Sequence, residues 1–132
     1  MDNPKKILFI DDERTFVEFV EKTFWPYKEE VLFLSAHTAD LGIEIALREK
    51  PQVVVLDLRM PGAMDGEGVL KRLKKELPET KFIVVSAWND GQNKDRILKE
   101  IGVDGYFDKP ISLREFMRTV LGFLSLDSRQ KS

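Results

Sequence analysis

Five short apolar runs recur along the chain, separated by stretches in which apolar residues return every three or four positions. Four of the runs are continuously apolar rather than alternating, which is typical of strands whose two faces are both covered, as in a parallel sheet. The predicted strands are 7–10, 31–34, 53–56, 82–85 and the weaker 106–107. The pattern therefore predicts a sheet of five parallel strands.

The intervening stretches carry the apolar stripe of amphipathic helices. The first predicted helix follows Glu13 and ends at Trp25-Pro26, because the residue before a proline is disfavoured in a helix. The others cover 39–48, 65 or 66 to 77, 92–101, and a last one after Ser112, which forms a capping box with Glu115. In the second helix Leu41, Ile45 and Ala46 are predicted to face inward. Phe19 and Trp25 are predicted to lie in the core, with a place on a protein-docking face as the alternative.

Strand and helix alternate five times without an internal repeat, which predicts right-handed crossovers and helices on both faces of the sheet. A chain of 132 residues has the size of one domain. The expected architecture is a doubly wound, flavodoxin-like α/β domain over residues 1–125, with 126–132 as a polar tail or the start of a linker. The second strand ends without a charged residue, which favours the strand order 2-1-3-4-5, with that strand at one edge.

Composition excludes several classes of function. Lys and Arg (21) nearly balance Asp and Glu (23), so no overall positive field would draw the domain onto nucleic acid or an anionic membrane. Without cysteine and with one histidine, a metal would have to be bound through oxygen. No apolar run reaches the length of a signal-peptide core or a membrane span, so the expected location is the cytoplasm.

Chemically active side chains gather at the carboxyl ends of four predicted strands: Asp11 and Asp12, Asp57, Ser86 and Lys109. Taken singly, each has a plain structural explanation, such as capping a helix or bracing a turn. Together they predict a site, because ligands of open α/β sheets bind outside the carboxyl ends of the strands. His37 follows the second strand and is expected to lie away from that crevice.

Three carboxylates in one crevice repel one another unless a cation neutralises them, and an all-oxygen set of ligands suits Mg²⁺. A carboxylate can also act as a nucleophile that forms an aspartyl phosphate. Lys109 would then neutralise the transferring group, and the Ser86 hydroxyl would donate a hydrogen bond to it.

The sequence resembles the receiver domain of two-component response regulators from Lys6 to Leu124. The resemblance rests on four segments, 7–13 (ILFIDDE), 55–66 (VLDLRMPGAMDG), 84–87 (VVSA) and 106–110 (YFDKP). It implies a signalling module rather than a turnover enzyme. It also implies phosphoryl transfer to Asp57 from a histidine kinase or a phosphotransfer protein.

The same resemblance implies roles for single residues. Mg²⁺ would be bound by Asp12, Asp57 and the backbone carbonyl of Arg59, with Asp11 holding it through water. Lys109 would contact the phosphoryl group and precede a cis proline, Pro110. Ser86 and Tyr106 would move as a switch that reshapes the surface of the fourth helix, fifth strand and fifth helix. That surface would act on a downstream effector domain or protein, while a homodimer stays an open alternative.

Two departures from the family pattern concern the rim of the site. Gly62-Ala63 gives two residues where the family usually has one, so the loop beside Asp57 is expected to differ in shape. The positions two beyond Asp57 and two beyond Ser86 are the large residues Arg59 and Trp88. We expect them to shield the acyl phosphate and lengthen its life.

Three other functions are compatible with an α/β fold of this kind. A phosphatase with an aspartate nucleophile would carry Asp-x-Asp after the first strand, where this chain has Asp11-Asp12-Glu13. A flavin-binding protein would need a phosphate loop there, which three acidic residues would oppose. The remaining alternative is a receiver-fold binding module that signals without phosphorylation.

Overall fold

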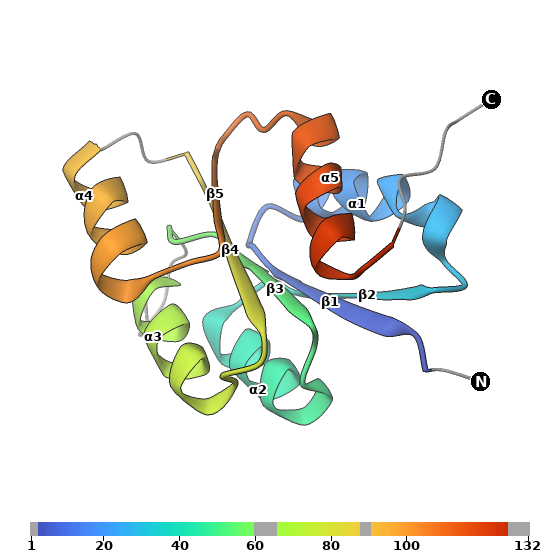
Figure 1. Ribbon diagram of the computed structural model, residues 1–132, viewed down its shortest axis with the longest axis horizontal. Coiled ribbons are helices and arrows are strands. Elements are labelled where there is room, and N and C mark those ends of the chain that lie inside the picture. The colour runs from blue at the N-terminus through green and yellow to red at the C-terminus, as the bar shows by residue number, and fades with distance from the viewer. Residues whose placement is uncertain (1–2, 60–65, 88–90, 127–132) are drawn as a thin grey trace.

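The computed structural model describes residues 3–59, 66–87 and 91–126, and within them five parallel strands form one sheet (Figure 1). The strands are β1 (Lys5–Ile10), β2 (Val31–Ala36), β3 (Val53–Leu56), β4 (Lys81–Ser86) and β5 (Gly105–Asp108). Their order is β2-β1-β3-β4-β5, with β2 and β5 at the edges. This confirms the predicted fold and strand order, although most strands are longer than their apolar runs.

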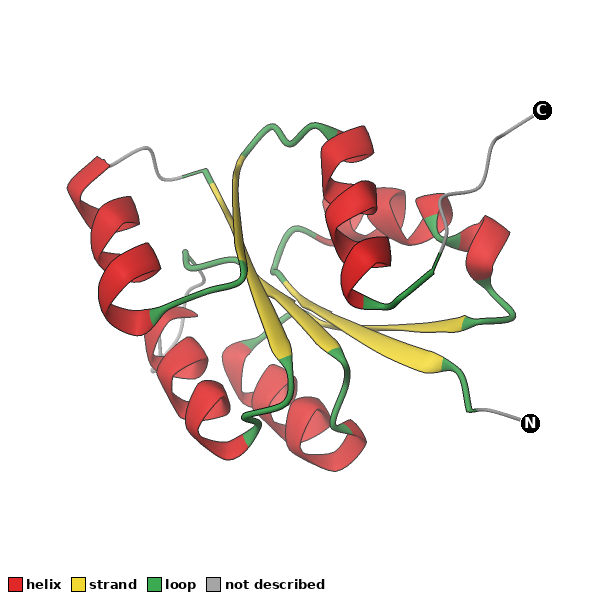
Figure 2. Cartoon of the chain, in the orientation of Figure 1, coloured by secondary structure: helices red, strands yellow, loops and turns green. Residues whose placement is uncertain are grey.

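Helices cover both faces of the sheet (Figure 2). They are α1 (Arg14–Thr23), α2 (Ala39–Glu49), α3 (Gly66–Glu76), α4 (Gly91–Arg96) and α5 (Leu113–Phe123), with a short 3₁₀ helix at Trp25–Tyr27. Helices α1 and α5 lie on one face, and α2, α3 and α4 lie on the other. As predicted, Ser112 caps α5, and its hydroxyl accepts a hydrogen bond from the Glu115 amide at 3.4 Å.

Two hydrophobic cores lie on the two faces of the sheet. The core under α1 and α5 is rich in aromatic rings, with Phe9 at its centre and Phe16, Phe33 and Phe116 around it at centroid distances of 5.8 to 6.2 Å. The core under α2, α3 and α4 is mainly aliphatic. Every residue of β3 is fully buried, which explains its continuously apolar sequence.

Three apolar residues predicted to lie inside are exposed, and those predictions were wrong. Phe19 is 57% exposed and Trp25 is 64% exposed. Leu41 is 41% exposed, because α2 buries a stripe at positions 39, 42, 43 and 46, and Leu41 lies off it. Phe19 likewise lies beside the stripe of α1 that contains Val17 and Val20, and Trp25 lies beyond the end of that helix.

The predicted fourth helix is two kinds of helix. Residues 91–96 form the α-helix α4, and Ile97–Ile101 continue it as a π-helical turn that ends at Gly102. Gly102 has a φ of 84°, a left-handed conformation that glycine adopts without steric cost. The periodicity of apolar residues predicted the helix, but it does not distinguish α-helical from π-helical winding.

Candidate functional site

The sheet brings the predicted strand-end residues to one edge. Asp11 directly follows β1, Asp57 follows β3, Ser86 is the last residue of β4, and Lys109 directly follows β5. Backbone hydrogen bonds continue the strand pairing across this edge, from the Asp57 amide to the Ile10 carbonyl at 3.0 Å and from the Lys109 amide to the Ser86 carbonyl at 2.9 Å. The four strand ends are therefore held in fixed register.

Three carboxylates form an acidic cluster at this edge. Asp11, Asp12 and Asp57 each place an oxygen within 4.8 Å of the others. Asp11 is fully buried and Asp57 is 5% exposed, whereas Asp12 is exposed. Burial raises the pKa of Asp11 above its ordinary value, and hydrogen bonds from the Glu13 amide and Lys109 offset only part of that rise. An all-oxygen cluster of this size is the kind of site that Mg²⁺ occupies.

Lys109 supplies the positive charge in the cluster. Its ammonium donates to Asp11 Oδ2 at 2.9 Å and to Asp57 Oδ2 at 3.2 Å, and it also pairs with Glu13. The ammonium lies 4.7 Å from the centroid of the Phe16 ring, within range of a cation–π interaction. Burial lowers the pKa of Lys109, but the carboxylates of Glu13, Asp11 and Asp57 outweigh it and raise that pKa above its ordinary value. Lys109 is therefore a permanent cation.

Backbone amides orient the two buried carboxylates. The Arg59 amide donates to Asp57 Oδ1 at 3.0 Å, and the Glu13 amide donates to Asp11 Oδ1 at 2.9 Å. Each carboxylate therefore has one oxygen held by its own turn and the other facing Lys109.

The other predicted site residues lie around this cluster. Ser86 is fully buried, Arg59 is exposed, and Tyr106 is half-buried in β5 with Lys94 Nζ 5.0 Å from its ring centroid. The Lys109-Pro110 bond is cis, as the resemblance implied. Trp88 and the Gly62-Ala63 segment lie outside the described residues.

Two contacts of the site were missed by sequence reasoning. Glu13 contacts Lys109 directly, which its place beside Asp12 could have suggested. His37 was expected to lie away from the crevice, and this was wrong. Its Nδ1 lies 2.9 Å from the Asp11 carbonyl oxygen, because β2 pairs with β1 and brings the two loops together.

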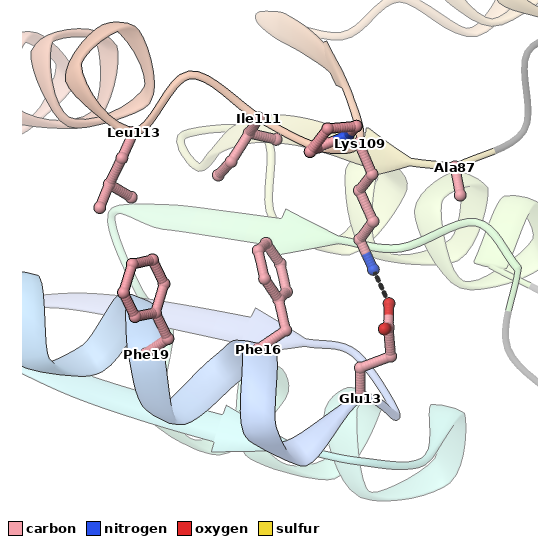
Figure 3. Close-up of a pocket in the computed structure, with 8 residues that line it drawn as sticks. Glu13, Phe16, Phe19, Ala87, Lys109, Ile111 and Leu113 are labelled. Atoms are coloured by element: carbon pink, nitrogen blue, oxygen red, sulfur yellow. Dashed lines mark hydrogen bonds and ion pairs between the residues drawn. The ribbon is translucent and has the colours of Figure 1, made fainter.

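An apolar groove of about 530 Å³ opens beside Lys109, between α1 and the segment that joins β5 to α5 (Figure 3). Phe16 and Phe19 line it from α1, and Ile111 and Leu113 line it from the other side. Its charged lining residues are Glu13 and Lys109, whose ion pair lies at one end of the groove. Across the described segments, no helix combines the length and the apolar character needed to span a membrane.

Comparison with known proteins agrees with this geometry. The sequence model of a family described as "Response regulator receiver domain" matches residues 7–121. The chain is 30% identical over 124 residues to "Sporulation initiation phosphotransferase F" of Bacillus subtilis (strain 168), covering 94% of this chain and 97% of that protein. It is 37% identical over 120 residues to "Probable transcriptional regulator ycf27" of Porphyridium aerugineum, covering 89% of this chain. The chain spans about half (48%) of that regulator's length.

Solved structures show the same fold. The Francisella response regulator 1452 receiver domain superposes with a TM-score of 0.80 at 28% identity, covering 93% of this chain and 98% of that chain. A CheY-like receiver domain protein from Methanospirillum hungatei JF-1 gives 0.82 at 24% identity, covering 93% and 95%. With a family match over residues 7–121 and the acidic cluster at the expected edge of the sheet, the chain belongs to the response regulator receiver domains of two-component signalling systems.

Proposed function

We propose that this domain accepts a phosphoryl group on Asp57 from a histidine kinase or a histidine phosphotransfer protein. The observation that carries the proposal is the setting of Asp57, a buried carboxylate that lies close to two other carboxylates and contacts the half-buried ammonium of Lys109. In the transfer, an Asp57 carboxylate oxygen attacks phosphorus, the P–N bond of the donor's phosphohistidine breaks, and the imidazole leaves.

The acidic cluster fits a resident Mg²⁺. Asp12, Asp57 and the backbone carbonyl of Arg59 would hold it, with Asp11 acting through a water molecule. A bound Mg²⁺ would neutralise charge on the oxygens of the transferring group. Lys109 would neutralise that charge from the other side, and the Ser86 hydroxyl would donate to a phosphoryl oxygen. The geometry that supports this is the 4.8 Å span of the carboxylates and the placement of Lys109 against two of them.

Phosphorylation would switch the surface formed by α4, β5 and α5 through Ser86 and Tyr106. Tyr106 is half-buried, with Lys94 over its ring and Lys94 Nζ 3.4 Å from Asp108 Oδ2, so a rotation of Tyr106 would change contacts of α4. The output would be a downstream effector domain or protein, since a matching regulator is about twice as long as this chain. We assign the domain itself no nucleic-acid contact and no membrane contact, and we retain the cytoplasm as its expected location.

The groove beside Lys109 is the proposed docking site of the phosphodonor. It is apolar, it includes the exposed Phe19, and it ends at the ammonium that contacts Asp57. A partner bound there would bring its phosphohistidine to the site while burying an aromatic side chain, which is the usual anchor of a protein interface.

Arg59 and Trp88 are proposed to set the lifetime of the phosphoaspartate by limiting the approach of water. Arg59 is exposed next to the Asp57 turn, where its amide holds Oδ1. We expect Trp88→Ala to accelerate dephosphorylation, measured as loss of the added mass with time. An unchanged rate would remove Trp88 from this role.

The proposed function is tested by mass spectrometry of the intact protein after incubation with Mg²⁺ and acetyl phosphate. One added phosphoryl group is expected in the wild type and in the control Asp40→Asn, whose carboxylate is exposed on α2. None is expected in Asp57→Asn. A wild type without an adduct from either a small donor or a cognate kinase would favour the phosphorylation-independent binding module. Hydrolysis of many substrate molecules would favour a phosphatase.

A further inference from the structure

The carboxylate of Glu13 contacts the site rather than its own helix. It is the N-cap residue of α1, where a side chain commonly accepts a hydrogen bond from a free amide of the first turn. Glu13 makes no such side-chain bond. Its carboxylate instead reaches Lys109 across the end of the apolar groove (Figure 3). The carboxylate is therefore engaged with the site rather than with its own helix.

The contacts of Lys109 show what this engagement means. An ammonium has three N–H donors, and that of Lys109 contacts three carboxylates, those of Asp11, Asp57 and Glu13. Asp11 and Asp57 belong to the acidic cluster that fits a cation, whereas Glu13 lies outside that cluster and its side chain is 60% exposed. A phosphoryl group on Asp57 would need at least one of these N–H donors. At least one of the three carboxylates must therefore lose its hydrogen bond from Lys109.

We propose that Glu13 is a positioning residue that holds the Lys109 ammonium at the end of the groove. If Asp11 and Asp57 bind Mg²⁺, Glu13 is the carboxylate that stays in contact with the Lys109 ammonium. The two donors released by Asp11 and Asp57 are then free for a phosphoryl oxygen, while Glu13 holds the ammonium toward the end of the groove and so opposes its movement toward Asp57. The inference rests on the proposed phosphoryl transfer to Asp57 and assigns Glu13 no contact with the reacting atoms.

Loss of the Glu13 contact has two opposite consequences. Without it, Lys109 is left with Asp11 and Asp57, competes more strongly with Mg²⁺ for them, and weakens Mg²⁺ binding. At saturating Mg²⁺ the same ammonium has no competing partner, so it reaches a phosphoryl oxygen more readily and phosphorylation speeds up. Because the Glu13 side chain is mostly exposed, each effect should be roughly twofold to fivefold.

The test compares Glu13→Gln, Glu13→Asp and the control Glu18→Gln, which removes one charge from an exposed position of α1. Glu13→Asp keeps the charge but shortens the side chain by one methylene, and aspartate is a favourable N-cap, so the helix should be retained. Two quantities are measured, the Mg²⁺ dissociation constant by calorimetry without a phosphodonor, and the acetyl phosphate rate constant at saturating Mg²⁺. Both Glu13 variants are expected to bind Mg²⁺ more weakly and to react faster, while Glu18→Gln matches the wild type.

Three results would overturn the inference. Glu13 variants that match the wild type in both measurements would show that the contact has no effect on the site. A Glu13→Asp variant that matches the wild type while Glu13→Gln differs would show an effect of charge alone. Equal shifts in Glu13→Gln and Glu18→Gln would show a general field effect. A wild type that never takes a phosphoryl group would end the proposed function, and the Mg²⁺ titration by itself would then decide the role of Glu13.

Discussion

Gly66 is the residue through which α3 packs against the turn that holds Asp57. Its amide donates to the Leu58 carbonyl at 3.2 Å. A Cβ atom at this position would lie 2.4 Å from the Leu58 Cα and 2.6 Å from the Asp57 carbonyl oxygen, both of them backbone atoms that cannot move aside alone. The absence of a side chain at Gly66 therefore permits the close approach of α3 to the site.

Gly66→Ala should destabilise the fold by about 1 to 3 kcal/mol, the usual cost of overpacking, and should slow phosphorylation because the Asp57 turn is displaced. The matched control is Gly122→Ala on α5, where a Cβ meets no atom within 4 Å and alanine should stabilise the helix by about 0.5 to 1 kcal/mol. Urea denaturation measures both free energies of unfolding. Equal effects of the two substitutions on the free energy of unfolding would contradict the close packing of Gly66 against the Asp57 turn.

Phe19 and Phe116 are both phenylalanines but differ in exposure, at 57% and 0%. Phe116→Ala should cost about 3 to 5 kcal/mol of stability, whereas Phe19→Ala should change it by less than about 0.5 kcal/mol. Phe19→Ala should instead lower the rate of transfer from a phosphohistidine protein, relative to the acetyl phosphate rate, by about fivefold or more. Trp25→Ala, which removes an exposed aromatic outside the groove, should leave that ratio unchanged. Equal ratios in Phe19→Ala and Trp25→Ala would remove Phe19 from docking.

At the scale of the elements, a bidentate ion pair joins α3 and α4. Arg96 donates to Glu67 Oε2 at 2.7 Å and to Glu67 Oε1 at 2.5 Å, and Lys71 lies 3.1 Å from the same carboxylate. Arg96 is the last residue of α4 before the π-helical turn, and Glu67 follows Gly66. The pair therefore links the end of α4 to the part of α3 that packs against the Asp57 turn.

Glu67→Gln should destabilise the protein by about 1 kcal/mol at neutral pH, because the pair is only partly exposed and geometrically favourable. Arg96 lowers the pKa of Glu67 from 4.5 to about 2. A lowered carboxyl pKa means that the contribution is complete above pH 4.5 and is lost as the pH falls through about 2. The difference in free energy of unfolding between the wild type and Glu67→Gln should therefore shrink as the pH falls from 4.5 to about 2.

Urea denaturation at neutral pH and in steps down to acid pH checks this dependence. The control is Glu76→Gln, which removes the more exposed Arg72–Glu76 pair within α3 and should cost only about 0.3 to 0.5 kcal/mol. An effect of Glu67→Gln that is no larger than that of Glu76→Gln, or that persists unchanged at the acid end, would show that the helix-to-helix pair adds no stability.

At the scale of the whole molecule, the charge is nearly balanced but unevenly placed. The net charge is -2, yet three aspartates converge at the carboxyl edge of the sheet. Lys109 compensates them only in part, and the pKa of Asp11 is raised by its burial and, to a smaller extent, by the charge of Asp57. A cation at this edge would therefore stabilise the folded state as a whole.

Mg²⁺ should raise the denaturation midpoint, by an amount that corresponds to about 2.7 kcal/mol when its concentration is 100 times the dissociation constant. A chelator should reverse the effect. Asp12→Asn and Asp57→Asn should each reduce the shift, whereas Asp40→Asn should retain it, since Asp40 lies on α2 outside the cluster. Equal shifts in all three variants would place the Mg²⁺ effect elsewhere.

The sequence by itself determined the fold and the composition of the site, because both depend on local patterns. Continuously apolar runs mark strands that are covered on two faces. The order of residues along the chain then gives the side chains that directly follow each strand. These local patterns suffice to place Asp11, Asp57 and Lys109 at one edge of the sheet.

Only the tertiary structure decided the contacts between elements distant in sequence. The pairing of Glu13 with Lys109, of Arg96 with Glu67, and the approach of His37 to Asp11 each join residues from different elements. The exposure of Phe19 and Trp25 also depends on the tertiary structure, because the elements packed around each of these residues leave its side uncovered. Periodicity along one chain records the face that a helix buries on average, but side-chain partners depend on the three-dimensional packing of several elements at once.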